Sequence, residues 1–581
     1  MTPHRLTLAA LAAACFALPA YAATGLPPSA QSGFTPPELG RGYIAPAPDV
    51  AKFIAEDGKA IGGPFRYGVA VPVKGVSLRR GKARAGEIVR LADGRDAWRV
   101  AVASPGAKSI DFEFARLELP EGAEMYLYDR DYNVLRGPIT RADVANEGNW
   151  FSAYVPGDVA VIEVAAAPAA LRAARVELAS LTHAYRGLWG VEDGAKSGSC
   201  NVDVICPAGD GWRDQIDSVG HYTFRQGSSS FVCTGSLIAN TGNTTTPYFL
   251  TANHCMSTAT VVSSMVTYWN YQSSTCRTPG STSSGTPLNR SIASHSQSGA
   301  TLIATNAASD FTLVRLSTDV PAASNPFWSG WDRSGAAPAA AVGIHHPAGH
   351  EMRISNENNP LSISGYLGAT GSGTTHLRVA DWDAGTTEGG SSGSGLWDAG
   401  NKLLVGQLHG GYAACGNNDA DWYGRLSVSW TGGGTAATRL RDWLDPGNTG
   451  VTTKAGYRGG TTPPPPPPTG LFTNGTDFTI NDNATVESPI TVSGRTGNAP
   501  ANLQVSVTIF HTWRGDLKVD LVAPDGSVYV LHNRSGGSAD NVIGTYTVNA
   551  SSEVANGTWR LRVNDNASGD TGRIDTWSLQ F

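Results

Sequence analysis

The sequence is poor in cysteine outside one segment, poor in charge, and free of long apolar runs. Of its seven cysteines, Cys15 lies near the N-terminus and the others all fall between residues 200 and 415. Charged residues make up only 16% of the chain and the formal net charge is −6, so we expect no nucleic-acid partner. No apolar run is long enough to cross a bilayer, so we expect no membrane span.

Glycine is abundant instead, with 69 residues among 581, and short apolar runs alternate with turns. A chain of this length predicts about three or four domains. Alternating short runs bounded by turn residues are typical of strands. The sequence therefore predicts a mainly β protein.

The first residues are typical of a secretory signal. A short basic start precedes an apolar run over residues 6–18, and residues 20–22 follow the small-x-small pattern of a cleavage site. A membrane anchor is the alternative, but the run is too short to span a bilayer. We expect residues 1–22 to be removed after Ala22 and the protein to be secreted into the extracellular medium.

Residues 23–196 contain no cysteine and carry strand-like runs at residues 87–91, 98–102 and 159–164. Apolar residues recur at every second position in these runs, which predicts a β-rich domain. A cysteine-free segment between a signal and a cysteine-containing domain is most simply a propeptide. A permanent N-terminal binding domain is the alternative.

The cysteines mark residues 197–450 as a separate unit. An even set in a secreted protein predicts three disulfides, and neither CxxC nor histidine-rich spacing supports the zinc alternative, so we expect no metal. Short apolar runs with turns between them predict a β-sandwich or barrel, with one helix over residues 436–444. The cysteines of this unit are Cys200, Cys206, Cys233, Cys255, Cys276 and Cys415.

Residues 451–469 predict a linker. The prolines from Pro463 to Pro468 favour a stiff polyproline II spacer; an SH3-type ligand is the alternative, although a secreted protein rarely meets such partners. Cleavage after Lys454 or Arg458 in this linker would release the C-terminal part. Apolar and polar residues alternate cleanly over residues 470–581, which predicts a further β domain, and this segment contains no cysteine.

Residues 387–395 form a run of glycine and serine whose side chains leave Ser392 accessible. Alone, this run would indicate a flexible linker. Two other segments argue against that interpretation: His254 precedes a cysteine after an apolar run, and Asp310 precedes another apolar run. The chain order His, Asp, Ser is that of chymotrypsin-type triads.

A serine hydroxyl needs a base within reach, and that base needs a partner that fixes its tautomer. We therefore assign Ser392 as nucleophile, His254 as general base and then acid, and Asp310 as the orienting carboxylate. The backbone amides of Gly390 and Ser392 would form the oxyanion hole. Each residue alone would be an ordinary surface or core residue, so the assignment depends on all three occurring in this order.

Residues 251–255, 309–313 and 390–394 resemble the bacterial lysyl endopeptidases, secreted chymotrypsin-fold serine proteases that cut after lysine. The resemblance runs from residue 197 to about residue 444. It implies a double β-barrel, protein and peptide substrates, and no required cofactor; we expect a monomer. It also implies the disulfide pairs Cys200–Cys415, Cys206–Cys276 and Cys233–Cys255.

Two positions depart from the family pattern. Gly395 stands where the family usually has proline, which should loosen the turn without removing chemistry. Ser391 stands where trypsin-like enzymes carry the aspartate that receives the new N-terminal amine. That ion pair cannot form here, so another contact must hold the oxyanion loop, and Cys200–Cys415 is a candidate.

The resemblance also implies a specificity pocket. The family's pocket aspartate falls on Asp421, with Asp419 as a competing candidate, and a carboxylate there would bind a buried lysine ammonium. His409 and Tyr366 fall where the family has a histidine and an aromatic ring, although Tyr366 could equally be a plain core aromatic. The predicted propeptide ends at Lys196, so an enzyme that cuts after lysine could release itself there.

Residues 511–517 and 556–563 resemble the P (homo B) domain of proprotein convertases, which implies a jelly-roll β-sandwich over residues 470–581. The domain contains aspartates of the kind that calcium binds, so calcium is a candidate ligand there, although turn chemistry explains them equally well. These aspartates are Asp516, Asp565, Asp570 and Asp575.

The leading hypothesis is a secreted serine endopeptidase specific for lysine. Arginine or dual Arg/Lys specificity is the nearest alternative among enzymes. A non-catalytic binding protein, built from a protease scaffold and a P domain, is the alternative from another class. A missing triad residue would favour the binding protein, and none is missing.

Overall fold

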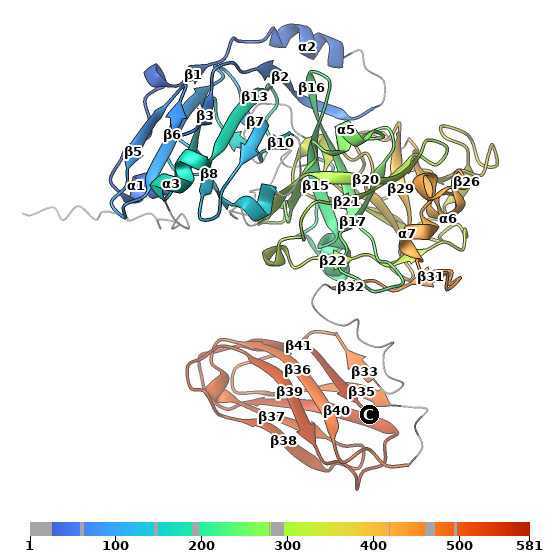
Figure 1. Ribbon diagram of the computed structural model, residues 1–581. Coiled ribbons are helices and arrows are strands. Elements are labelled where there is room, and N and C mark those ends of the chain that lie inside the picture. Colours follow the sequence, from blue (N-terminus) through green and yellow to red (C-terminus); the bar gives the residue numbers. More distant parts are fainter. Residues whose placement is uncertain are drawn as a thin grey trace, which may run out of the picture. The chain divides into compact units, whose positions relative to one another are not determined.

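The computed structural model describes residues 26–58, 63–144, 149–188, 197–277, 279–280, 295–417, 419–458, 471–492, 495 and 497–581. The chain divides into two compact units, residues 1–460 and residues 461–581 (Figure 1). Strands dominate both units, so the predicted mainly β class is confirmed. The predicted signal with Ala22, the Lys196 junction and the prolines 463–468 lie outside the described residues.

The N-terminal part of the first unit is a two-sheet β structure. Its core is formed by buried side chains from both sheets, among them Trp98, Phe112 and Leu127. The first sheet has the order β1-β6-β12-β8-β9, with β5 beside β6. Its strands are β1 (Tyr43–Ile44), β5 (Glu87–Arg90), β6 (Asp96–Ala103), β8 (Glu124–Asp129), β9 (Leu135–Ile139) and β12 (Val159–Ala166).

The second N-terminal sheet continues into the cysteine-containing part of the chain. Its strands are β2 (Phe65–Pro72), β3 (Ser77–Arg79), β4 (Lys82–Ala83), β7 (Ser109–Glu118), β10 (Trp150–Phe151), β11 (Val155–Pro156) and β13 (Arg175–Ala184). Strand β2 pairs with β13 on one side and with β16 (Ser229–Leu237) on the other. A single sheet therefore runs from one part of the chain into the other.

Short helices connect these strands. They are α1 (Pro28–Gln31), η1 (Leu39–Arg41), α2 (Val50–Asp57), η2 (Arg141–Val144) and α3 (Pro168–Ala173). Asp49 caps α2 by accepting a hydrogen bond from the backbone N–H of Lys52 at 3.2 Å.

The cysteine-containing part has two halves, each built on antiparallel strands. In the first half β16 pairs with β15 and β17, β15 with β18, and β17 with β21. The strands are β15 (Val219–Gln226), β17 (Tyr248–Ala252), β18 (Val266–Trp269), β19 (Ser296–Ser298), β20 (Ala300–Asn306) and β21 (Phe311–Leu316).

The second half has the strand order β14-β25-β24-β28-β29-β30-β27-β26. These are β14 (Val202–Asp203), β24 (Ala341–His345), β25 (Arg353–Glu357), β26 (Ser362–Ser364), β27 (His376–Val379), β28 (Gly395–Asp398), β29 (Leu404–Gly411) and β30 (Asp421–Arg425). The short helices of both halves are η3 (Pro207–Trp212), α4 (Arg213–Ile216), α5 (Ala259–Val262), η5 (Ala322–Ser324), η6 (Pro347–Gly349), α6 (Leu426–Thr431), η7 (Ala436–Thr438) and α7 (Arg441–Leu444).

Three disulfides join the halves and their loops: Cys200–Cys415, Cys206–Cys276 and Cys233–Cys255. This is the pairing that the family resemblance implies. Cys200–Cys415 connects the first residues of this part to the loop after β29.

The predicted helix over residues 436–444 is wrong as a single element. Arg439 has an extended backbone, with φ −146° and ψ 158°, and separates η7 from α7. This break lets Leu440 turn inward, where it is fully buried and its N–H donates to the Ser429 carbonyl at 3.0 Å.

The predicted linker is also partly structured. Residues 453–458 form β31 (Thr453–Lys454) and β32 (Tyr457–Arg458), which pair with β23 (Trp331–Asp332) and β22 (Phe327–Trp328). Arg458 forms ion pairs with Asp214 at 2.5 Å and Asp217 at 2.9 Å. Lys454 and Arg458 therefore belong to the folded unit, contrary to the prediction that they lie in an exposed linker.

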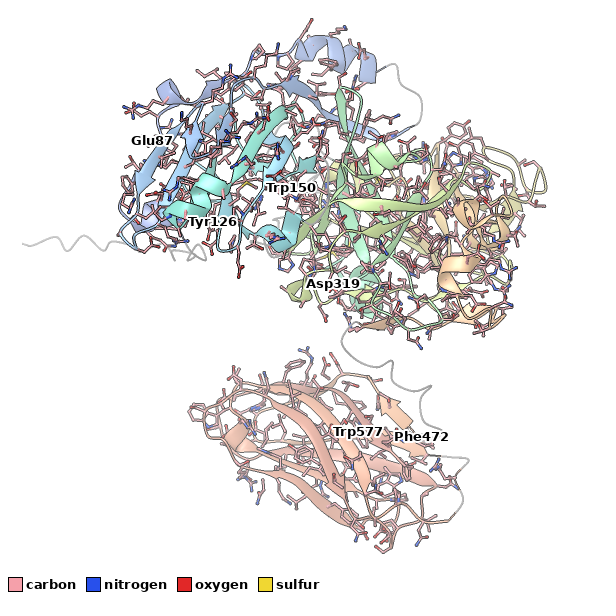
Figure 2. The ribbon with its side chains drawn as sticks, in the orientation of Figure 1. Glu87, Tyr126, Trp150, Asp319, Phe472 and Trp577 are labelled. Atoms are coloured by element: carbon pink, nitrogen blue, oxygen red, sulfur yellow. A yellow bond between two sulfur atoms is a disulfide. The ribbon has the colours of Figure 1, made fainter. Side chains whose placement is uncertain are left out.

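The second unit is a sandwich of two antiparallel sheets. One contains β33 (Leu471–Asn474), β34 (Phe478–Ile480), β36 (Leu503–His511), β39 (Val542–Val548) and β41 (Gly572–Gln580). The other contains β35 (Thr485–Val492), β37 (Leu517–Val522), β38 (Val528–Asn533) and β40 (Gly557–Asp565), and η8 (Arg514–Asp516) precedes β37. Trp577, labelled in Figure 2, and Trp559 are buried in its core.

The candidate calcium ligands form no cluster of three carboxylate or histidine side chains among the described residues of this unit. Asp516, Asp565, Asp570 and Asp575 are all described, and none belongs to a group of three or more metal-ligating side chains. Asp565 is buried beside His511 Nε2 at 3.4 Å, and Asp570 accepts a hydrogen bond from Thr512 Oγ1 at 2.5 Å. Across the described ranges of both units, no helix is long and apolar enough to cross a membrane.

Candidate functional site

Two neighbouring strands bring His254 and Asp310 together. His254 follows β17 and Asp310 precedes β21, and Ala252 pairs with Phe311 in the antiparallel register. Asp310 Oδ2 accepts a hydrogen bond from His254 Nδ1 at 2.7 Å, and Asp310 Oδ1 accepts one from the His254 backbone N–H at 2.9 Å. One carboxylate oxygen thus orients the imidazole, as a general base requires, and the other holds the backbone of the same residue.

The loop that carries Ser392 is held by glycines with left-handed backbones. Gly390 has φ 96° and Gly393 has φ 81°. A Cβ atom on Gly393 would lie 2.2 Å from Thr251 Oγ1, so only glycine fits there. The Ser392 carbonyl accepts a hydrogen bond from the Thr234 N–H at 2.9 Å, which ties the loop to β16.

Ser392 and His254 are not hydrogen-bonded to each other: in the described part of the chain no hydrogen bond joins Ser392 Oγ to His254 Nε2. Such bonds are often long in substrate-free enzymes and shorten when substrate binds. The structure pairs two of the three predicted residues and places the third in the adjoining cavity, beside His409.

The predicted oxyanion donors are free of other partners among the described residues. Neither the Gly390 nor the Ser392 backbone N–H donates a hydrogen bond to any of these residues. The loop is nevertheless rigid, because Ser391 Oγ accepts from the Glu388 N–H at 3.2 Å and bonds His345 Nδ1 at 2.8 Å. Burial lowers the pKa of His345 to about 3, so this ring is neutral.

Glu388 has a role that the sequence analysis missed. Its carboxylate accepts the Gly198 N–H at 2.9 Å and 3.0 Å and Asn201 Nδ2 at 3.3 Å. The Ser197 N–H, also buried, donates to His350 Nδ1 at 2.9 Å. Glu388 therefore anchors residues 197–201 to the oxyanion loop; an acidic residue within a Gly/Ser run was the available signal.

Asp421 is buried with one oxygen unpaired. Its Oδ2 accepts hydrogen bonds from Thr387 Oγ1 at 2.7 Å and Trp382 Nε1 at 2.8 Å, whereas its Oδ1 has no hydrogen-bond partner among the described residues. Burial raises the pKa of Asp421 to about 6, against the effect of those two hydrogen bonds and of the Ala413 backbone N–H, which lies near the carboxylate. The competing candidate, Asp419, is exposed and accepts from Asn417 Nδ2 at 3.0 Å.

His409 and Tyr366 stack beside His254. The Tyr366 ring lies 3.5 Å from the His409 ring at an interplanar angle of 6°, and His409 lies 5.5 Å from His254 at 16°. Tyr366 is 40% exposed, so it is a wall of the site and not a core aromatic. The sequence analysis missed His376, whose Nε2 lies 3.0 Å from His409 Nδ1.

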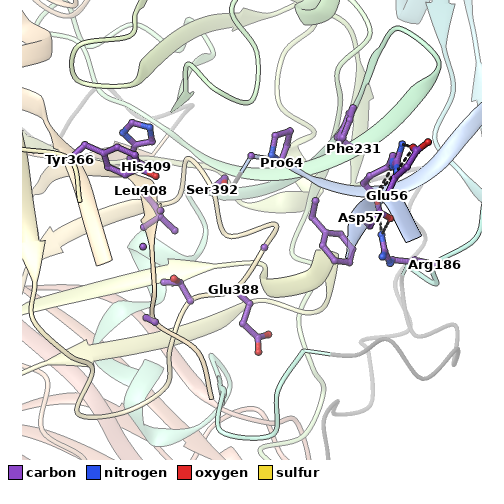
Figure 3. A pocket seen from close by; sticks show the side chains of 18 residues that line it. Glu56, Asp57, Pro64, Arg186, Phe231, Tyr366, Glu388, Ser392, Leu408 and His409 are labelled. Atoms are coloured by element: carbon purple, nitrogen blue, oxygen red, sulfur yellow. Dashed lines mark hydrogen bonds and ion pairs between the residues drawn. The ribbon is translucent and has the colours of Figure 1, made fainter. Parts of the chain in front are cut away.

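A cavity of about 630 Å³ is lined by Ser392, His409 and Tyr366, whereas His254, Asp310 and Asp421 lie outside its lining (Figure 3). In Figure 3, Ser392 lies between His409 on one side and Pro64 on the other. The wall near Pro64 comes from the N-terminal part of the chain. The Phe65 ring packs against Gly389, and a Cβ atom added to this glycine would lie only 3.2 Å from the ring. The N-terminal part therefore occupies one side of the site.

One group of metal-ligating side chains occurs among the described residues: His254, Asp310 and His409, whose ligand atoms lie within 4.8 Å of one another. The same atoms form the hydrogen bond between His254 and Asp310 described above. The contact of His254 with Asp310 within this group is also the one that acid–base chemistry requires of a histidine and its orienting carboxylate.

Comparison with protein families gives two matches. Residues 194–424 match the family described as lysyl endopeptidase, C-terminal domain, and residues 500–581 match the proprotein convertase P-domain. Both matches fall where the sequence analysis placed the two resemblances, which are therefore confirmed.

Individual relatives cover different parts of the chain. A lysyl endopeptidase of Pseudomonas aeruginosa is 28% identical over 349 residues, which is 57% of this chain and 72% of that protein. Leupeptin-inactivating enzyme 1 of Streptomyces exfoliatus is 65% identical over 112 residues, 19% of this chain and 26% of that protein. The chain thus spans only about a quarter of the latter relative.

A solved structure of a Glu endopeptidase is 18% identical, with a TM-score of 0.23, over 36% of this chain and 85% of that chain.

Proposed function

We propose that the protein is a secreted serine endopeptidase that hydrolyses peptide bonds on the C-terminal side of lysine. His254 removes the proton from Ser392 Oγ as Ser392 attacks the scissile carbonyl, and later donates it to the leaving amine. Asp310 holds the imidazole and stabilises its charged form. The N–H groups of Gly390 and Ser392, which no described residue uses, donate to the developing oxyanion.

The observation that carries the proposal is the unpaired Oδ1 of the buried Asp421 among the described residues. Thr387 lines the cavity that contains Ser392 and also donates to Asp421 Oδ2, so the carboxylate lies directly behind the cavity wall. A lysine ammonium entering there would meet the buried carboxylate and complete its hydrogen bonding.

The same contact favours lysine over arginine. Asp421 Oδ2 already accepts two hydrogen bonds, so only Oδ1 is open. A guanidinium binds a carboxylate best through two parallel bonds to both oxygens, whereas an ammonium needs only one acceptor. The stacked rings of Tyr366 and His409 add a flat wall on the side of the catalytic pair.

The N-terminal part, residues 23–196, acts as a propeptide that closes the site. Strand β2 is added to β16, and Arg225 forms buried ion pairs with Glu113 at 2.8 Å and Asp111 at 3.3 Å. Residues 63–66 line the cavity with Ser392. Cleavage after Lys196 by the enzyme itself would break the covalent link between this part and the protease. The C-terminal P-domain remains as an accessory module.

The proposal is tested with three peptide substrates that differ only in having Lys, Arg or norleucine before the scissile bond. The processed protein is expected to cleave the lysine peptide with the highest kcat/KM. Equal rates for Lys and Arg would favour the dual-specificity alternative. No cleavage of any of the three would favour a non-catalytic scaffold.

A further inference from the structure

His376 is a buried histidine that the catalytic scheme above does not use. It begins β27 and is only 1% exposed. Its Nε2 lies 3.0 Å from His409 Nδ1, and its Nδ1 lies 2.8 Å from Thr375 Oγ1. At the other end, His409 Nε2 lies 3.7 Å from Asp310 Oδ2. These contacts form a chain that ends at the catalytic carboxylate.

The positions of the protons in this chain follow from its ends. A carboxylate offers only lone pairs, so the His409 Nε2 that faces Asp310 is favoured as N–H and disfavoured as a lone pair. His409 Nδ1 must then be an acceptor, and the hydrogen bond at 3.0 Å requires His376 Nε2 to donate. His376 Nδ1 is in turn an acceptor, and Thr375 Oγ1 donates to it.

We propose that His376 is a positioning residue that fixes the tautomer of His409, so that a second imidazole N–H faces Asp310 opposite His254. The role rests on the proposed function, since it concerns the geometry of the same catalytic pair. His376 touches neither substrate nor the reacting atoms and acts only through His409. Without its donor, His409 would be free to move its proton to Nδ1 and turn a lone pair toward the carboxylate.

The surroundings agree with one proton on each ring. Burial lowers the pKa of both His376 and His409 to about 4, so both are neutral at pH 7 and each carries one N–H. The titratable groups that face the pair are Asp310, His254 and Tyr366; Tyr366 stacks on His409 and lies 5.4 Å from His376, ring to ring. In neutral rings the direction of each hydrogen bond is decided by its neighbours.

The kinetic test compares His376→Phe, which removes the donor, with His376→Gln, whose amide N–H can replace it. His376→Phe is expected to lower kcat about tenfold, as loss of an outer hydrogen-bond partner commonly does, with KM unchanged because Asp421 is untouched. Asp310 would no longer be faced by the His409 N–H at 3.7 Å and would hold the imidazolium of His254 more tightly, so the acid limb of the kcat profile should move to higher pH.

His376→Gln should restore most of kcat and return the acid limb to its wild-type position. Thr375→Val should lower kcat less than His376→Phe does, and Thr374→Val, at an exposed neighbour, should change nothing. Wild-type kcat and pH profile in His376→Phe would overturn the proposal, as would equal losses in the Phe and Gln variants.

A second measurement needs neither activity nor a folded Phe variant. In the full-length Ser392→Ala protein labelled with ¹⁵N-histidine, nitrogen shifts distinguish protonated from bare ring nitrogens. Protonated Nε2 and bare Nδ1 are expected for both His376 and His409 at neutral pH. A proton on His409 Nδ1 would overturn the proposal. Wild-type protein that cleaves no peptide would refute the proposed function instead, while this spectrum would still report the tautomers.

Discussion

Replacing Asp421 by asparagine tests the specificity pocket with little change in shape. The amide oxygen can still accept from Thr387 and Trp382, so the pocket wall should keep its hydrogen bonds. The negative charge that meets the lysine ammonium is lost. Breaking a buried ion pair by removing one partner costs about 3–5 kcal/mol, which corresponds to roughly 10²- to 10⁴-fold in kcat/KM for the lysine peptide.

The loss should be specific to the cationic substrate. A norleucine peptide, which has no ammonium, should be cleaved by Asp421→Asn at about the wild-type rate. Asp419→Asn is the matched control, because Asp419 is exposed and lies two positions away. If Asp419→Asn lost as much lysine activity as Asp421→Asn, or if Asp421→Asn kept it, the assignment of the pocket carboxylate would be wrong.

The pH dependence provides an internal check. Burial raises the pKa of Asp421 to about 6, so in wild-type protein without substrate the carboxylate becomes protonated as the pH falls through 6. Preference for lysine over norleucine should therefore decline below about pH 6 and be absent in Asp421→Asn at every pH.

The same shift sets the sign of the effect on stability. A raised pKa means that the folded state binds the proton more tightly than the unfolded state, so this carboxylate destabilises the fold as the pH rises through 6. Asp421→Asn should accordingly have a Tm at pH 8 no lower than wild type. A large drop in Tm would show that lost activity reflects lost structure.

Three further outcomes are expected. Ser392→Ala should lower kcat by about 10⁶, and the purified precursor should remain uncut; trimming after Lys196 in that variant would rule out self-processing. Glu388→Gln keeps the shape of the side chain but removes the negative charge that accepts the Gly198 N–H. The kcat should therefore fall with KM little changed, and an unchanged kcat would show that Glu388 does not support the oxyanion loop. The isolated N-terminal part added in trans should inhibit the processed enzyme. Arg225→Met should weaken that inhibition, because Asp111 and Glu113 would be buried without their cationic partner. Full inhibition of the Arg225→Met enzyme would mean that these ion pairs contribute little.

Local patterns in the sequence predicted much of the fold. Apolar and polar residues alternate over residues 470–581, which predicted strands there, and in β36 every second residue is indeed buried. The helix over residues 436–444 was predicted wrongly because its apolar spacing is helical, whereas Leu440 is pulled into the core by a tertiary hydrogen bond to Ser429. Residues 453–458 have no strong strand pattern and pair only because partner strands are available.

The site was predicted in part. The contact of His254 with Asp310 follows from residues adjacent to two strands, which short motifs can indicate. Glu388 and His376 could not be identified in the same way, because their partners lie far away in the sequence, at Gly198 and His409. Long-range hydrogen bonds of this kind leave no local pattern.

Mapping the cut sites in a digest of denatured proteins by mass spectrometry tests the central claim most directly. The processed enzyme is predicted to produce peptides that end in lysine, with cuts after arginine rare. Cuts after arginine as frequent as those after lysine would contradict the account of the pocket around Asp421, and cuts without preference for either would contradict the account as a whole.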